Sequence, residues 1–433
     1  MKRKISTVEL AGKLGQPGTV IIDVRPMAAY NGWPLRGEAR GGHLPGAAAL
    51  PESWLASLEG ETLLSLLASK GITPGKQVII YGYRGQGGEL AGRLAELGFA
   101  DLFVYAHGLQ AWAADERLPL ERLPHYQKLV YPAWLQARRE RAPANQQAAD
   151  FALFHVNFDA PDAYLAGHIP GAFYLDTKAL ESPVNGNRRP AAELQAALLA
   201  HGITSAKTVV LYGRDSDPVS GQEEPGQIAA MRAAAILMYA GVEDVRLLDG
   251  GYEAWVAAGF AVETTPHVPQ PAADFGVQIP AHPAYFIDRQ EAKELLADPA
   301  AELVSIRTWR EYIGEESGYD YIGPRGRIAG AVWGNCGSDA NHMQHYRNPD
   351  NTMRAYPEIA ANWQEAGITP DKRLSFYCGT GWRASEAFFY AHLMGWRQIA
   401  IYDGGWLEWS SRPDLNPIAR GVPQTSQAAA GRS

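Results

Sequence analysis

Hydrophobic residues along the chain occur in short β-branched runs, separated by stretches with helical spacing. In the first third of the chain such runs lie at residues 20–22, 78–80 and 102–104, and residues 89–97 have helical character. Alternation of short apolar strands with helices is typical of βα units, in which a parallel sheet is covered by helices on both faces. The pattern therefore predicts an α/β fold.

The same pattern near the C-terminal end leads into a candidate site. Residues 374–377 form a strand-like run, and Cys378 follows it in a glycine-rich turn. A helix is expected from about Ala384, with apolar residues at helical spacing at Ala387, Tyr390, Ala391 and Met394. Because ligands of parallel sheets bind beyond the carboxyl ends of the strands, this turn lies where a binding site is expected.

Three motifs recur in the same order along the chain. Gly-His-Leu-Pro-Gly-Ala at 42–47 returns as Gly-His-Ile-Pro-Gly-Ala at 167–172 and, altered, as Gly-Arg-Ile-Ala-Gly-Ala at 326–331. A Gly-Ile-Thr triplet precedes a strand-end tyrosine in each copy, and Asp-Gly-Gly at 249–251 and 403–405 marks the end of two copies. Such self-similarity predicts tandem copies of one unit. We expect domains at 1–125, 126–275 and 276–423, followed by a tail at 424–433.

Composition limits the classes of partner and the cellular compartment that we expect. A formal net charge of −8 and a pI near 5.8 argue against nucleic acid or an anionic membrane as the main partner. Two cysteines provide no disulfide framework and suit a reducing compartment. No apolar segment follows the basic N-terminus, so we expect no signal peptide, no membrane span and a cytoplasmic location. The cysteines lack metal-ligand spacing, and no metal or cofactor is expected.

The environment of Cys378 favours its use as a nucleophile. Gly379 and Gly381 allow successive backbone N–H groups to point inward, and the start of the following helix favours negative charge. Arg383 adds a positive charge at the same rim. These features stabilise a thiolate, the reactive form of cysteine. A buried structural cysteine is the alternative.

The length of the turn indicates the chemistry. Cys378 and Arg383 are separated by four residues, one fewer than in thiol-dependent phosphatases, and the smaller ring suits a persulfide better than a phosphate. This Cys-Gly-Thr-Gly turn resembles the active-site loop of the rhodanese sulfurtransferases, especially their mercaptopyruvate branch. The resemblance covers nearly the whole chain and implies three rhodanese-like domains.

The resemblance implies a ping-pong sulfur transfer. Cys378 would accept sulfane sulfur and hold it as a persulfide, and Arg383 would stabilise the charge. The cradle would be formed by Gly379, Thr380, Gly381 and Trp382. The donor would be thiosulfate, 3-mercaptopyruvate or the protein persulfide of a cysteine desulfurase, and the acceptor a thiophile or a sulfur-acceptor protein.

The first two units lack the nucleophile, because Gly82 and Gly213 stand at the position of Cys378. In the mercaptopyruvate branch an Asp and a His of the silent domain couple to the hydroxyl of the loop. Asp159 and His168 have the matching spacing, so with Thr380 they are a candidate acid/base relay. The alternative is that His168 only holds its turn, as His43 would do in the first unit.

Two further residues bear on the site. Glu311 occupies the position at which the two-domain enzymes carry an arginine that binds the donor, so we expect thiosulfate and mercaptopyruvate to bind weakly and a protein donor to be favoured. Cys336 follows a strand-like segment and is expected in the core, with a resolving thiol as the alternative.

Two other functions compete with sulfur transfer. A cysteine-dependent phosphatase or arsenate reductase would share the nucleophile, although the loop length argues against it. A non-catalytic scaffold, in which all three units bind proteins, would leave Cys378 without a chemical role.

Overall fold

The computed structural model describes residues 3–141, 151–215 and 226–423. It contains three five-stranded sheets with the same strand order, in which the first strand of each repeat is followed across the sheet by the fifth, fourth, second and third. Neighbouring strands are parallel throughout the first and third sheets, and so are the pairs β7–β8, β7–β9 and β9–β10 of the second. The predicted α/β fold with three rhodanese-like sheets is confirmed; the proposed tail at 424–433 lies outside the described residues.

The first repeat shows how the hydrophobic pattern builds a two-faced sheet. Its strands are β1 (Arg3–Lys4), β2 (Thr19–Asp23), β3 (Ala48–Ala49), β4 (Gln77–Tyr81) and β5 (Leu102–Tyr105). Its helices are α1 (Thr7–Ala11), α2 (Met27–Asn31), η1 (Glu52–Ala56), α3 (Gly60–Ser69), α4 (Gly88–Glu96), α5 (Gly108–Ala114) and η2 (Tyr126–Lys128).

Successive side chains of a strand point to opposite faces, so each apolar run contributes side chains to two hydrophobic cores. Ile22 and Ile80 pack in one core with Leu90 of α4, whereas Ile21 and Ile79 pack in the other with residues of α1 and α5. The helices therefore cover both faces of the sheet, as the continuous apolar runs predicted.

The second repeat has β6 (Leu129–Val130), β7 (Phe151–Asn157), β8 (Phe173–Asp176), β9 (Thr208–Tyr212) and β10 (Asp244–Leu248). Its helices are α6 (Pro132–Arg141), α8 (Asp162–Ala166), η3 (Thr177–Ala179), α9 (Ala191–Ala200), α10 (Gly226–Ala240) and α11 (Gly251–Ala257).

The third repeat has β11 (Phe286–Ile287), β12 (Ala301–Ser305), β14 (Val332–Trp333), β15 (Arg373–Tyr377) and β16 (Ile399–Tyr402), with β13 (Arg327–Ile328) and β17 (Ile418–Ala419) in a separate antiparallel pair. Its helices are η4 (Pro283–Tyr285), α12 (Arg289–Ala297), α13 (Trp309–Ile313), α14 (Tyr356–Glu365), α15 (Trp382–Leu393) and α16 (Gly405–Ser410).

The described chain forms two compact units. One contains the first repeat up to Tyr131 together with Asn348–Ile359, and the other contains the rest of the second and third repeats. The inserted segment is bound within the first unit by a hydrogen bond of 2.7 Å from the Trp54 indole to Asp350 and by an ion pair of 2.6 Å between Lys70 and Glu358. This segment lies inside the range expected for the third domain.

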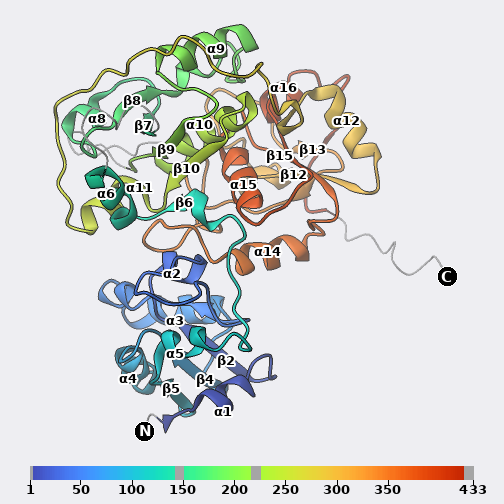
Figure 1. Cartoon of the computed structure of the whole chain (residues 1–433). Helices are drawn as coiled ribbons and strands as arrows, with labels where there is room; N and C mark the ends of the chain where they lie inside the picture. Colours follow the sequence, from blue (N-terminus) through green and yellow to red (C-terminus); the bar gives the residue numbers. More distant parts are fainter. Residues whose placement is uncertain (1–2, 142–150, 216–225, 424–433) are drawn as a thin grey trace. The chain divides into compact units, whose positions relative to one another are not determined.

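The second and third repeats share one unit because α10 and α15 pack against each other (Figure 1). Every residue of α10 is buried, and so are ten of the twelve residues of α15. A helix that is buried all round lies in the core of a larger body. No helix of the described residues combines the length and apolar character needed to cross a bilayer.

Candidate active site

Cys378 follows β15, which lies between β16 and β12 in the third sheet. Gly381 adopts φ +90° as the residue before α15, so the helix begins at Trp382, two residues earlier than the sequence predicted. The first N–H groups of a helix lack partners within it, and they are therefore directed towards the loop that carries the thiol. Cys378 is a free cysteine with 2% exposure.

The backbone of the loop is held by the start of α16. Trp406 donates its N–H to the carbonyl of Cys378 at 2.8 Å, and Leu407 donates to the carbonyl of Gly379 at 3.1 Å. Gly405, at φ +52°, permits this approach, because a Cβ there would lie 2.5 Å from the Gly379 carbonyl oxygen. The Asp-Gly-Gly motif of this repeat thus positions the candidate loop.

Tyr319 contacts the candidate loop directly, and sequence reasoning missed it. Its hydroxyl oxygen accepts a hydrogen bond of 2.7 Å from the Gly379 N–H and a second, short one from Arg383. Burial raises the pKa of Tyr319 well above its usual range, so the hydroxyl keeps its proton. The oxygen accepts both of these hydrogen bonds, so the hydroxyl proton remains available for another acceptor in the site.

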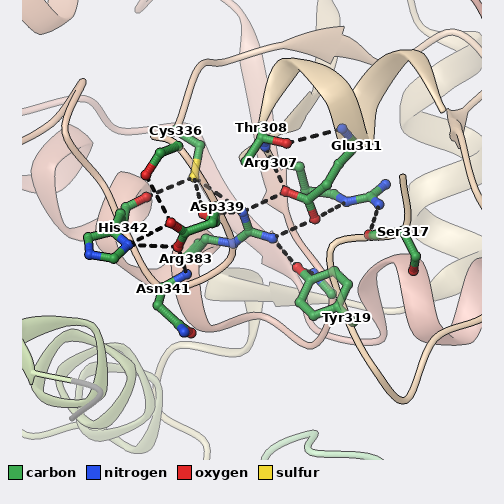
Figure 2. Close-up of polar contacts among 12 residues, drawn as sticks. Arg307, Thr308, Glu311, Ser317, Tyr319, Cys336, Asp339, Asn341, His342 and Arg383 are labelled. Atoms are coloured by element: carbon green, nitrogen blue, oxygen red, sulfur yellow. Dashed lines mark hydrogen bonds and ion pairs between the residues drawn. The ribbon is translucent and has the colours of Figure 1, made fainter. Parts of the chain in front are cut away.

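Arg383 lies between Glu311 and Cys336 (Figure 2). Two hydrogen bonds of 2.9 Å join its guanidinium to the Glu311 carboxylate, and a third contact of 3.2 Å reaches the Cys336 sulfur. Arg383 lines the same cavity as Cys378. Its proposed action on a persulfide stays a prediction.

Glu311 is directed inward by a capping box. The Thr308 hydroxyl accepts from the Glu311 N–H at 3.1 Å, and the carboxylate accepts from the Thr308 N–H at 2.8 Å, which closes the first turn of α13. Burial alone would raise the pKa of Glu311, but Arg383 and Arg307 outweigh it and lower the pKa to about 2. The carboxylate is thus an internal counterion rather than the open negative charge expected to repel donors.

Cys336 is fully buried, with its sulfur 3.4 Å from both the His342 carbonyl oxygen and the Met343 sulfur. Burial raises its pKa to about 11. A neutral thiol in this position packs as a small apolar side chain.

A cavity of about 700 Å³ opens beside Cys378. The second repeat contributes Phe158 and Glu181 to its wall, and the third contributes Trp382, Tyr319 and Tyr321. The Trp382 indole donates to Glu181 at 2.9 Å, and its ring meets Phe158 edge to face with centroids 5.7 Å apart. Aromatic side chains from both repeats therefore line the cavity, together with the buried carboxylate of Glu181 and with small, polar and aliphatic residues.

Glu181 is fixed by a polar network behind the cavity. Arg232, fully buried, donates to Glu181 at 2.5 Å and is paired with Asp403 at 2.8 Å. Arg188 donates to Asp403 from its backbone at 2.8 Å and from its guanidinium at 3.0 Å. These ion pairs join the second repeat to the Asp-Gly-Gly turn of the third.

The structure does not bring Asp159, His168 and Thr380 together. Asp159 is exposed and pairs with Lys178 at 2.7 Å. The His168 ring is buried against Tyr164, and its Nε2 faces Glu263. Thr380 lines the cavity of Cys378 together with Tyr321 instead. These contacts do not join the three side chains into a relay, and an acid/base role of Asp159 and His168 stays a prediction.

Comparisons with known proteins show which family the chain resembles. The family of rhodanese-like domains matches residues 6–115, 132–258 and 288–412. Thiosulfate sulfurtransferase YnjE of Escherichia coli (strain K12) is 43% identical over 411 residues, covering 94% of this chain and 91% of that protein.

Two solved structures are similar over almost the whole chain. The anaerobic ergothioneine biosynthesis enzyme from Chlorobium limicola, in complex with trimethyl histidine, has a TM-score of 0.91 and 45% identity, covering 98% of this chain and 100% of that one. EanB with a cysteine persulfide and ergothioneine has a TM-score of 0.90 and 45% identity, covering 97% of this chain and 100% of that one. Because three rhodanese-like domains match and a sulfurtransferase is 43% identical over 411 residues, the chain belongs to the rhodanese family and is a sulfurtransferase.

Proposed function

We propose that Cys378 receives sulfane sulfur as a persulfide and passes it to the imidazole ring of a small betaine, trimethyl histidine or a close analogue. The observation that carries this proposal is the composition of the cavity beside the thiol. Phe158, Trp382 and Tyr321 line the cavity, and aromatic rings attract quaternary ammonium groups. Glu181 lies in the same wall, but it is paired with Arg232 and burial raises its pKa to about 7, so the aromatic side chains carry the recognition.

The cavity is less suited to a tightly held anion. Of the cations that line it, Arg383 is bound to Glu311, and Lys178 is paired with Asp159. Thiosulfate then acts as a transient sulfur donor rather than as the ligand for which the cavity is shaped. Mercaptopyruvate and the persulfide of a cysteine desulfurase remain further candidate donors.

The chemistry is balanced without an added oxidant. The Cys378 thiolate attacks the outer sulfur of thiosulfate, the sulfur–sulfur bond of the donor breaks, and sulfite leaves. In the second step a carbon–sulfur bond forms between the imidazole carbon and the outer sulfur of the persulfide. The bond between the two sulfurs breaks, Cys378 leaves as thiolate, and the proton from the carbon is released. The sulfane sulfur is reduced as the ring carbon is oxidised.

Tyr319 is the residue placed to move a proton in the second step. Its hydroxyl contacts the Gly379 N–H of the thiol loop, and its raised pKa keeps it protonated at neutral pH. General acid–base catalysis by a positioned side chain contributes roughly 10²–10⁴-fold. We assign Tyr319 as the general acid that protonates the ring nitrogen as the carbon–sulfur bond forms, and the proton released from the ring carbon restores the tyrosine.

The solved relatives support this assignment. Structures of EanB include variants at a tyrosine and a threonine, bound to ergothioneine or hercynine, and a persulfide on a cysteine. The spacing of those three residues equals that of Tyr319, Cys378 and Thr380 in this chain. A second candidate function is transfer from thiosulfate to a simple thiophile, which the relation to YnjE favours.

The test is anaerobic turnover with thiosulfate and trimethyl histidine, with the sulfur-containing product quantified by mass spectrometry. Histidine is the matched control, because it has the same ring but a primary amine. Cation–π attraction predicts a preference for the trimethylated substrate of about tenfold or more. Sulfur transfer to cyanide with none to trimethyl histidine would instead assign the second function.

A further inference from the structure

Three potential ligands converge in the second repeat, outside the cavity described above. Glu263 Oε1 lies 3.6 Å from His168 Nε2 and 2.7 Å from His267 Nε2. One ligand atom from each of the three residues lies within 4.8 Å of the other two. None of the three is among the described residues that line the cavity of Cys378.

His168 is oriented as a metal-ligating histidine would be. Its Nδ1 is 2.8 Å from the Tyr164 carbonyl oxygen, which can only accept, so Nδ1 carries the ring proton and Nε2 carries the lone pair. Stacking on Tyr164, with centroids 3.8 Å apart, fixes the ring. A backbone carbonyl on one ring nitrogen is the usual outer-shell arrangement of zinc-bound histidine.

The Nε2 atom of His168 is fully buried and has no hydrogen-bond partner among the described residues, although the Thr265 carbonyl approaches the ring. It faces a carboxylate oxygen of Glu263, which is also an acceptor. Two acceptors directed at each other are unfavourable unless a positive charge lies between them. A cation there would satisfy both atoms.

The other two ligands are held by backbone contacts and are open to solvent. His168 and Glu263 form an antiparallel bridge with hydrogen bonds of 2.9 and 3.0 Å. The His267 N–H donates to the Tyr164 hydroxyl at 2.9 Å. The side chains of Glu263 and His267 are 29% and 37% exposed, which provides an entry path for an ion.

We propose that His168, Glu263 and His267 bind a divalent transition-metal ion, with Zn²⁺ as the best fit. Zn²⁺ takes imidazole and carboxylate ligands at about 2.0–2.2 Å, which places neighbouring ligand atoms about 3.3–3.6 Å apart in a tetrahedron. The separation of 3.6 Å already meets this value, and that of 2.7 Å meets it after a side-chain rotation. Water fills the fourth position. The ion cross-links the segment after α11 to the turn at residues 167–172.

The other repeats provide internal controls. In the first repeat His43 and Glu121 form the same bridge, with His43 Nε2 3.8 Å from Glu121, but no three-ligand group occurs there among the described residues. His125 occupies the sequence position that corresponds to His267. In the third repeat the corresponding antiparallel pair is Arg327 and Ala419, so neither the histidine nor the glutamate is present.

The experiment uses the full chain with Cys378→Ser as background, so that the reactive thiol does not bind metal. After chelator treatment, the protein is titrated with Zn²⁺ alone by calorimetry, and bound metal is counted by mass spectrometry after dialysis. We expect one ion per chain, a higher thermal midpoint with Zn²⁺, and a Co²⁺ absorption spectrum of a tetrahedral nitrogen–oxygen site.

The variants His267→Ala and Glu263→Gln should each weaken binding at least tenfold and abolish the thermal shift, whereas the matched His125→Ala should leave both unchanged. Both ligands are partly exposed, and circular dichroism of the metal-free variants checks their folding. Absence of stoichiometric binding, or binding unaffected by His267→Ala, would overturn the proposal.

Discussion

The guanidinium of Arg383 is bound to the carboxylate of Glu311 by two hydrogen bonds of 2.9 Å. The arginine of the thiol loop is therefore fixed by α13, and the carboxylate that stands where an arginine would bind the donor is neutralised from inside. Arg307 contacts the same carboxylate at 3.2 Å. This arrangement makes Glu311 part of the scaffold that orients the loop.

Replacement of Glu311 by Gln should destabilise the protein in a pH-dependent manner. Removing one partner of a buried ion pair costs about 3–5 kcal/mol, because two arginines remain buried without their counterion. The pKa of about 2 in the folded state, against an ordinary 4.5, means that the stabilisation is present above about pH 4.5 and is lost as the pH falls towards 2.

Thermal midpoints of the wild type and Glu311→Gln, compared at pH 7, 5 and 3.5, check this prediction. The difference between them should shrink only below about pH 4.5. Glu193→Gln is the control, because its ion pair with Arg189 is exposed and contributes about 1 kcal/mol or less. A difference that is constant across this pH range would contradict the assigned role.

Tyr319→Phe should separate the two half-reactions. The variant keeps the ring but loses the hydroxyl, so persulfide formation on Cys378 should persist while transfer to the imidazole carbon slows by about 10²-fold or more. Stopped single-turnover assays of each half-reaction measure this split. Tyr321→Phe is the matched control, since Tyr321 also lines the cavity, whereas Gly379 donates its N–H to Tyr319. Equal losses in both half-reactions would argue for a purely structural Tyr319.

Gly379→Ala should displace Tyr319. A Cβ at this position would lie 2.5 Å from the Cζ atom of the tyrosine ring, closer than packed atoms allow. Overpacking of this kind costs about 1–3 kcal/mol. We expect a lower thermal midpoint and slower carbon–sulfur transfer, whereas Gly323→Ala, which has no neighbour within 4 Å, should be neutral. Wild-type transfer in Gly379→Ala would show that the ring contact is dispensable.

The two cysteines should differ in reactivity. Cys378 lines the cavity, whereas Cys336 is fully buried and its pKa is raised to about 11, so almost none of it is thiolate at pH 8. Iodoacetamide under native conditions should label the Cys378 peptide first, and Cys336 only after denaturation, as peptide mass spectrometry would show. Faster labelling of Cys336 would contradict its placement.

Local patterns in the sequence were sufficient to predict the sheets, the repeats and the candidate nucleophile. Each strand run, each glycine turn, and Cys378 with its helix are contiguous in the chain. The walls of the site were not predictable in this way. The hydrogen-bonded pairs that form them are far apart in the sequence. Tyr319 and Gly379 are separated by 60 positions, Glu311 and Arg383 by 72, and Glu181 and Trp382 by 201. No local signal marks such pairs.

Spacing alone was also misleading where folding supplied a different partner. Asp159 and His168 match the pattern of a relay, but His168 turns to Glu263, far later in the chain, and Asp159 remains at the surface beside Lys178. For the same reason the three candidate metal ligands carry no sequence signature: an antiparallel bridge brings two of them together only in the folded repeat.

The most direct test of the account is a single-turnover experiment with sulfur-labelled thiosulfate. Intact-mass analysis should show a gain of one labelled sulfur on the wild type and none on Cys378→Ser. After removal of free thiosulfate, addition of trimethyl histidine should return the protein to its original mass and place the label in the thiolated product. No sulfur gain on the wild type, or a persulfide that trimethyl histidine leaves intact, would contradict the account.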